Sequence, residues 1–205
     1  MSESGSDWPT QVMGTLTKSQ AERRARVIRS ALELASDGGY DAVQMRDVAT
    51  QANVALGTIY RYFSSKDALL ASAMVEWMAE LETRVDARPP AGATTAERVM
   101  DVLDRALRAM QREPELARAV VTALTAGDPA GVEALTGMRE TLARIMRPAF
   151  PKDVDPSLEA SVSRVVGHVW WSAMIAWANG MGNMEWVFDE LSEAVHLLAT
   201  PFDTP

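Results

Sequence analysis

Apolar residues recur at helical spacing three times between residues 19 and 63. The first repeat places Ile28, Ala31, Leu32 and Ala35 at positions i, i+3, i+4 and i+7. Residues 45–52 and 56–63 show the same spacing. The sequence "DGGY" predicts the end of the first helix, with Gly38 or Gly39 in the left-handed conformation. Three short helices, with a tight turn between the last two, predict a helix-turn-helix module.

Helical spacing continues through the rest of the chain, and no segment alternates with period two over a useful length. Further helices are predicted near residues 65–86, 95–111, 114–126, 131–147, 157–180 and 184–199, separated by stretches rich in glycine and proline. We therefore predict an all-α fold. It comprises a mobile tail at 1–17, a helix-turn-helix domain at 18–66 and a larger helical domain at 67–205.

Charge is distributed unevenly along a chain whose formal net charge is −8. Residues 15–66 carry eight basic side chains against five acidic ones, whereas residues 67–205 carry twelve against twenty-one. A basic first part on an acidic remainder predicts that nucleic acid is contacted by the first part alone.

Several classes of protein are disfavoured by what the sequence lacks. It has no cysteine, no signal-peptide pattern at its start, and no apolar stretch of the ~20 residues that a membrane span needs. We expect a soluble cytoplasmic protein without a membrane segment. No catalytic motif occurs, and His168 and His196 lack metal-ligand spacing, so we predict no enzyme, catalytic residue, metal or cofactor. We expect His168 to be a core histidine.

The sequence "GTIYRYF" at residues 57–63 combines aromatic and basic side chains. On a helix, Ile59 and Phe63 point inward, Thr58, Arg61 and Tyr62 point outward, and Tyr60 lies at the boundary. The second helix of a helix-turn-helix enters the major groove by its N-terminal end. There, hydroxyl and guanidinium groups reach bases, while tyrosines and lysines bind phosphates on either side. Lys66 at the next helix start is placed to bind a phosphate.

The stretch "VQMRDVATQANVALGTIYRYFSSKDALL" resembles the DNA-binding domain of the TetR family of bacterial repressors. The resemblance implies a homodimer that binds double-stranded DNA, with a C-terminal ligand-binding and dimerising domain. Two recognition helices related by a two-fold axis imply an inverted-repeat operator. Arg46 is similar in position to a base-contacting residue, Thr58 and Arg61 to groove-facing residues, and Tyr60, Tyr62 and Lys66 to phosphate contacts. The predicted DNA-binding set is Gln44, Arg46, Leu56, Gly57, Thr58, Tyr60, Arg61, Tyr62 and Lys66. Gln44 and Ala55 stand where the family has hydroxyl-bearing helix caps.

Two stretches of the larger domain, "RAMQREPELARA" and "VWWSAMIAW", resemble family members that repress cholesterol catabolism in actinobacteria. This resemblance implies a hydrophobic ligand, either a sterol-derived acid or its coenzyme A thioester, that releases the repressor from DNA. A sensor of another hydrophobic or fatty acyl ligand is an alternative. An all-α small-molecule carrier is an alternative of another class.

The helix near 157–180 is apolar on two faces, which requires burial on both sides. We predict that one face meets a helix near 95–111 around the ligand, and that the other joins the last helix in a four-helix dimer interface. The predicted ligand-binding residues are Met100, Leu103, Leu107, Met110, Trp170, Met174 and Trp177. The predicted interface residues are Trp171, Ile175, Leu191, Val195 and Leu198. The alternative for each methionine or tryptophan is plain core packing.

Overall fold

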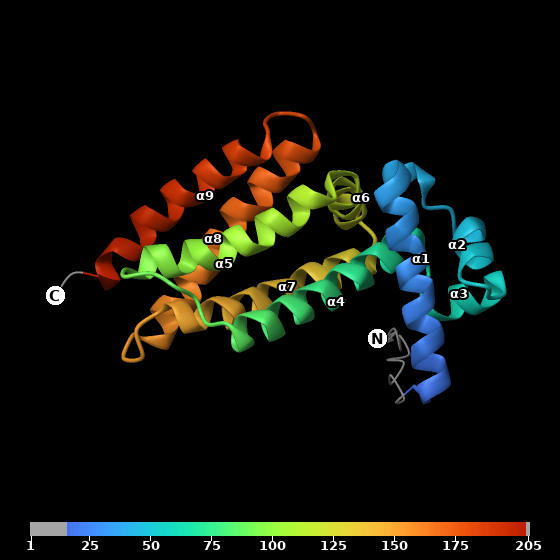
Figure 1. Cartoon of the computed structure of the whole chain (residues 1–205), viewed down its shortest axis with the longest axis horizontal. Coiled ribbons are helices and arrows are strands. Elements are labelled where there is room, and N and C mark those ends of the chain that lie inside the picture. Colours follow the sequence, from blue (N-terminus) through green and yellow to red (C-terminus); the bar gives the residue numbers. More distant parts are fainter. Residues whose placement is uncertain (1–15, 204–205) are drawn as a thin grey trace, which may run out of the picture.

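The computed structural model describes residues 16–203, which form nine α-helices and two short 3₁₀ turns (Figure 1). In chain order these are α1 (Lys18–Ala42), α2 (Met45–Gln51), α3 (Leu56–Tyr62), α4 (Lys66–Ala87), α5 (Thr95–Arg112), α6 (Pro114–Thr125), α7 (Pro129–Met146), η1 (Arg147–Ala149), α8 (Pro156–Ala178), α9 (Met184–Ala199) and η2 (Thr200–Phe202). No strand occurs between residues 16 and 203. The predicted all-α fold is confirmed. The predicted tail lies outside the described residues, apart from its last two.

None of the helices in this described range combines the length and the apolar character needed to cross a membrane.

Six helices begin where the sequence supplies a side-chain cap. Each cap oxygen accepts a hydrogen bond from a backbone N–H in the first turn, which would otherwise lack a partner. The caps are Thr17 for α1, Ser65 for α4, Thr94 for α5, Asp128 for α7, Asp155 for α8 and Asn183 for α9. Ser65 also donates a hydrogen bond from its Oγ to Oδ2 of Asp128 at 2.8 Å. This contact ties together the starts of α4 and α7.

Helix α1 is interrupted near the position predicted for its end. Gly38 and Gly39 have non-helical backbone angles, and Gly39 has a positive φ of 69°. A short helical turn then continues to Ala42, five residues beyond Asp37. Gly39 therefore supplies the positive φ that "DGGY" predicts, and the chain bends there before α2.

We call α1–α3 the head and α4–α9 the body. The head is held by a buried apolar cluster that includes Val27, Val48, Ile59 and Phe63. Leu69, Leu70 and Ala73 of α4, and Ala119 and Ala123 of α6, belong to the same cluster. Head and body therefore share a continuous core, and α1 packs along α6.

The body has two layers beside the head (Figure 1). Helices α4 and α7 both start next to the head and run away from it side by side. Helices α5, α8 and α9 form the second layer, with α8 and α9 joined as a hairpin. Helix α6 lies between this layer and α1, so it contacts the head on one side and α8 on the other.

The second layer has its own core, which α5, α8 and α9 share. Leu107 of α5, Met174 and Trp177 of α8, and Leu191 of α9 are all buried in it. The guanidinium group of Arg118, on α6, lies 4.7 Å from the Trp177 ring centroid. This cation–π contact joins α6 to the end of α8.

Candidate DNA-binding surface and ligand cavity

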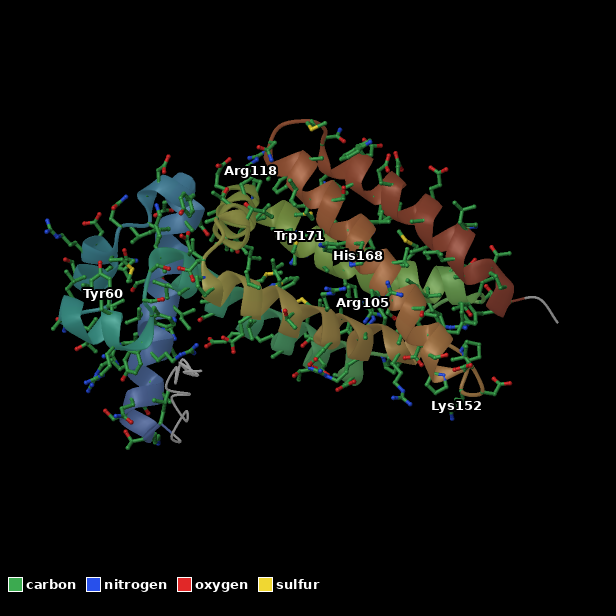
Figure 2. The ribbon with its side chains drawn as sticks, turned by 180° about the vertical axis from the view of Figure 1, so that it is seen from behind. Tyr60, Arg105, Arg118, Lys152, His168 and Trp171 are labelled. Atoms are coloured by element: carbon green, nitrogen blue, oxygen red, sulfur yellow. The ribbon has the colours of Figure 1, made fainter. Side chains whose placement is uncertain are left out.

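The end of the head farthest from the body is formed by α2, α3 and the turn between them. Asn53 in this turn has a positive φ of 52°, a conformation that asparagine tolerates better than most residues. Ile59 and Phe63 are buried beneath α3, as predicted. Tyr60 is 52% exposed, and Figure 2 shows it at the opposite end of the molecule from Lys152. Helix α3 thus has one buried face and one face that is exposed to solvent.

This outward face combines open backbone with unpaired positive charge. Gly57 is exposed, and a Cβ built on it would meet no atom within 4 Å. Arg46 on α2 and Arg61 on α3 are exposed, and no carboxylate among residues 16–203 forms an ion pair with either. The Arg61 guanidinium group lies 5.2 Å from the Tyr62 ring centroid. Neither arginine has to break an ion pair with a described residue before it approaches a polyanion.

Helices α2 and α3 begin at the two positions where the sequence lacks the expected hydroxyl-bearing cap. Gln44 and Ala55 occupy the N-cap positions of α2 and α3, and neither side chain accepts a capping hydrogen bond. Instead, Nε2 of Gln44 donates to the backbone oxygen of Asp41 at 2.9 Å. The first-turn N–H groups of α3 therefore have no side-chain cap in the free protein, and Leu56 and Thr58 beside them are half-buried.

Tyr62 differs from the prediction. Its hydroxyl is buried and has no hydrogen-bond partner among the described residues. The ring lies beside Phe63, with centroids 6.2 Å apart, and packs against the head core. Tyr62 is the last residue of the seven-residue α3, and the residue is half-buried. This placement corrects the predicted phosphate contact, because the hydroxyl does not reach the surface.

Lys66 begins α4, as predicted, but its ammonium group is held by the head. Its Nζ donates to the backbone oxygen of Tyr40 at 3.2 Å and lies 3.7 Å from the Tyr40 ring centroid. The Tyr40 hydroxyl donates to Oδ1 of Asp67 at 2.6 Å. Burial, followed by this hydrogen bond and the nearby carboxylates, raises the pKa of Tyr40 to about 12. The contact of Lys66 with phosphate remains a prediction.

A mostly apolar cavity of about 270 Å³ lies between α4, α7 and α8. Its lining is Met74, Met78, Leu135, Met138, Arg139, Leu142, Gly167, His168, Trp170 and Trp171. Nη2 of Arg139 lies 3.1 Å from Nε2 of His168, and both side chains are exposed. His168 is therefore not the core histidine that we expected. The cavity pairs an apolar interior with one cationic group at its edge, which suits a hydrophobic ligand with an anionic end.

The structure relocates most of the predicted ligand-binding face. Of that set, Trp170 lines this cavity and Met110 lines a second one, described below. Leu103, Leu107, Met174 and Trp177 are buried in the core shared by α5, α8 and α9, and Met100 packs against it. The physical reason is that α9 and α6 close over this face of α8. The methionines of α4 and α7 were overlooked, although Met74 and Met78 share one helix face at spacing i, i+4.

The predicted dimer interface also needs correction. Leu191 and Val195 are 0% and 1% exposed, so they belong to the body core. Trp171 lines the cavity, and Ile175 and Leu198 are half-buried against the core. The exposed large apolar residues of α8 and α9 are instead Leu158 at 47% and Leu197 at 73%. Leu191, Val195 and Leu198 follow helical spacing, but the sequence did not reveal which face turns inward.

Comparisons with known proteins agree with this architecture. Residues 27–73 match the model of "Bacterial regulatory proteins, tetR family", and residues 92–198 match "Tetracyclin repressor-like, C-terminal domain". The chain is 36% identical over 182 residues to the HTH-type transcriptional repressor KstR of Rhodococcus jostii (strain RHA1), covering 89% of this chain and 85% of that protein.

Two solved structures are similar in fold. A TetR transcriptional regulator from Rhodococcus sp. RHA1 superposes with a TM-score of 0.78 and 26% identity, over 88% of this chain and 97% of that one. FadR of Thermus thermophilus, a TetR-family repressor in complex with lauroyl-CoA, gives a TM-score of 0.64 and 21% identity, over 85% of this chain and 92% of that one. At that identity, the second likeness shows the fold alone.

Proposed function

Because the chain belongs to the tetR family of bacterial regulatory proteins, we propose that it is a transcriptional repressor released from DNA by a hydrophobic ligand. The observation that carries the proposal is the pairing of an exposed, cationic α3 face at one end with an apolar cavity in the body. The similar protein from Rhodococcus jostii is named a repressor, which supports a regulatory role over a catalytic one. We place its action on operator DNA in the cytoplasm.

On the DNA side, α3 enters the major groove. Arg46 and Arg61 supply donors for bases or phosphates, and Gly57 lets the backbone approach closely. Tyr60, with its exposed phenol, binds a backbone phosphate. Residues 18–66 act as the DNA-binding domain, and residues 67–205 bind the ligand and dimerise.

The repressor acts as a homodimer on an inverted repeat. Helices α8 and α9 form the last hairpin of the body, and they carry the exposed Leu158 and Leu197. Pairing these helices across a two-fold axis removes both apolar side chains from water. It also presents two α3 helices to two half-sites, which a monomer cannot engage together.

The ligand combines an apolar body with an anionic end. The cavity between α4, α7 and α8 is lined by methionine, leucine and tryptophan, and Arg139 is the cation at its edge. The resemblance of "VWWSAMIAW" to regulators of cholesterol catabolism supports a sterol-derived acid or its coenzyme A thioester. A fatty acyl thioester, the class to which the lauroyl-CoA of the Thermus thermophilus FadR belongs, is the alternative ligand.

Fluorescence anisotropy with DNA flanking its own gene tests the function. We expect salt-sensitive binding of that DNA over a scrambled duplex, and loss of binding when a sterol-derived carboxylic acid or its thioester is added. Release by lauroyl-CoA alone would move the assignment to the fatty acyl class. Ligand binding without any preference for the flanking DNA would contradict the repressor function and favour a helical carrier.

A further inference from the structure

A second cavity, of about 560 Å³, lies where the head meets the body. We call it the junction cavity. Its walls come from α1 and the end of α2 in the head and from α4, α5 and α6 in the body. The apolar part includes Leu32, Met74, Trp77, Met110, Leu116 and Val120. A molecule held there would touch both parts of the protein at once.

One side chain belongs to both cavities. Met74 of α4 lines the junction cavity and also the cavity between α4, α7 and α8, which we call the body cavity. Of the two cavities, Trp77 lines only the junction cavity and Met78 only the body cavity. Helix α4 therefore separates the two spaces. Methionine is unbranched and has three rotatable bonds, so a change of rotamer at Met74 can join the two spaces.

The volumes favour a ligand that uses both spaces. Pockets for small molecules of drug size usually measure about 300–1,000 Å³. The body cavity, at about 270 Å³, is smaller than this range, whereas the junction cavity at about 560 Å³ lies within it. A sterol-sized or long acyl ligand therefore fits the body only if part of it extends beyond the body cavity.

The charges at the two ends are opposite. Arg139 stands at the edge of the body cavity, whereas Glu33, Asp37 and Glu113 line the junction cavity together with one cation, Arg29. Glu33 accepts a hydrogen bond from Nε2 of Gln51 at 2.5 Å. The Gln51 amide is neutral, so it does not compensate the charge of the Glu33 carboxylate. Likewise, Glu113 accepts from Oγ of Ser36 at 2.6 Å. Neutral donors leave both carboxylates negative, so an anionic ligand end is favoured at Arg139 and disfavoured at the junction.

We propose that the ligand spans both cavities, with its anionic end at Arg139 and its apolar end beyond Met74 in the junction cavity. This inference rests on the proposed function, because it assigns the ligand's path within the same repressor. Met74 then determines which ligand lengths are accepted. Only a ligand that reaches past it contacts α1, and contact with α1 makes ligand affinity depend on how the head is oriented.

A brominated fatty acid tests the path directly, because bromine quenches tryptophan fluorescence on contact. The probe is 16-bromohexadecanoate, used below its micelle concentration, with 2-bromohexadecanoate as the matched control. We expect the terminal bromine to quench Trp77 and the 2-bromo acid to leave Trp77 unquenched. The contribution of Trp77 is the difference between the wild type and Trp77→Phe. Equal quenching of Trp77 by both acids, or by neither, would overturn the proposed path.

Chain length gives a second test. If the tail continues into the junction cavity, affinity should rise about fourfold per added methylene from octanoate to hexadecanoate, as expected from ~0.8 kcal/mol per buried CH₂. Ala109→Phe, which fills the junction cavity, should weaken hexadecanoate at least tenfold and change octanoate less than twofold. Met78→Phe, which narrows the body cavity, should weaken both acids. An affinity for hexadecanoate that is unchanged by Ala109→Phe would contradict the proposal.

The two hypotheses fail differently. Release of operator DNA without quenching of Trp77 would overturn the spanning path and leave the repressor function standing. Quenching of Trp77 by a ligand that never releases operator DNA would support the path and overturn the function.

Discussion

The ammonium group of Lys66 lies 3.7 Å from the ring centroid of Tyr40 and donates to that residue's backbone oxygen at 3.2 Å. Tyr40 lies in the last turn of α1, and Lys66 is the first residue of α4, so this contact fixes the start of the body's first helix to the head. Asp67 completes the arrangement by accepting the Tyr40 hydroxyl proton in a hydrogen bond.

The position of Lys66 predicts its effect on DNA affinity. A side chain already held by Tyr40 loses less conformational entropy when it contacts phosphate. Lys66→Ala should lower affinity for all sequences alike and reduce the salt slope by about one unit. Lys152→Ala is the matched control, since Lys152 lies at the other end of the molecule (Figure 2). A change in base preference on Lys66→Ala would contradict this role.

Tyr40 predicts an alkaline transition. Its pKa is raised from 10.0 to about 12, so the folded state keeps the phenol proton after the unfolded state has released it. The contribution of this group to the free energy of unfolding should therefore not change with pH below pH 10. It should fall between about pH 10 and 12. Absorbance at 295 nm after a pH jump should show one late-ionising tyrosine. Tyr40→Phe should remove that step; its persistence would assign the shift elsewhere.

Arg46 predicts a sequence-specific contact. It is exposed near the start of α2 and free of ion pairs with described carboxylates. Arg46→Ala should cost about 1–3 kcal/mol of operator binding and relax discrimination at one base position. Arg84→Ala, near the far end of α4, should leave binding and base preference unchanged. A uniform loss across all sequences would make Arg46 a phosphate contact instead.

Tyr62 predicts a gain in stability. Its buried hydroxyl has no partner among residues 16–203, so Tyr62→Phe removes an unsatisfied polar group and should raise the free energy of unfolding by about 1 kcal/mol. DNA affinity should stay within twofold. Tyr60→Phe is the contrast, because the exposed Tyr60 should lose DNA affinity without a change in stability. Destabilisation of the Tyr62→Phe protein in urea titrations would show that the hydroxyl has a partner.

Leu197 and Leu191 predict two different failures. Leu197→Asp alters an exposed residue of α9 and should give a folded monomer with weak operator binding. Leu191→Asp buries an unpaired charge, at a cost of roughly 3–5 kcal/mol, and should unfold the body. Sedimentation and circular dichroism distinguish the two results. Val132→Asp, at an exposed apolar position on α7, is the control. A dimeric Leu197→Asp protein would place the interface elsewhere.

The helices were predictable because capping residues and prolines close to each boundary determine where a helix begins. Ser65, Thr94 and Asn183 cap helices where they stand, and Pro114 and Pro156 begin others. The same holds for the inward faces of Ile59 and Phe63, since one short helix over one core leaves a single choice of face.

The body cavities were not predictable in this way. Helix α8 is apolar on both sides, so periodicity could not decide whether Trp171 or Met174 faces a cavity. That choice depends on how α6 and α9 close over α8, which is a tertiary property. The buried hydroxyl of Tyr62 was missed for a similar reason, because its burial depends on how the end of α3 packs against the head core.

The hydrogen bond between Ser65 and Asp128 joins the starts of α4 and α7. An opening of α4 against α7 that preserves this hydrogen bond is a rotation about the point where both helices begin. Met74 lies nine residues along α4, ~13 Å from that point at ~1.5 Å per residue, and the end of the 22-residue helix lies ~33 Å away. In such a rotation, the displacement of the far end of α4 is more than twice the displacement at Met74. Lys66, beside the rotation point, changes its orientation but hardly its position.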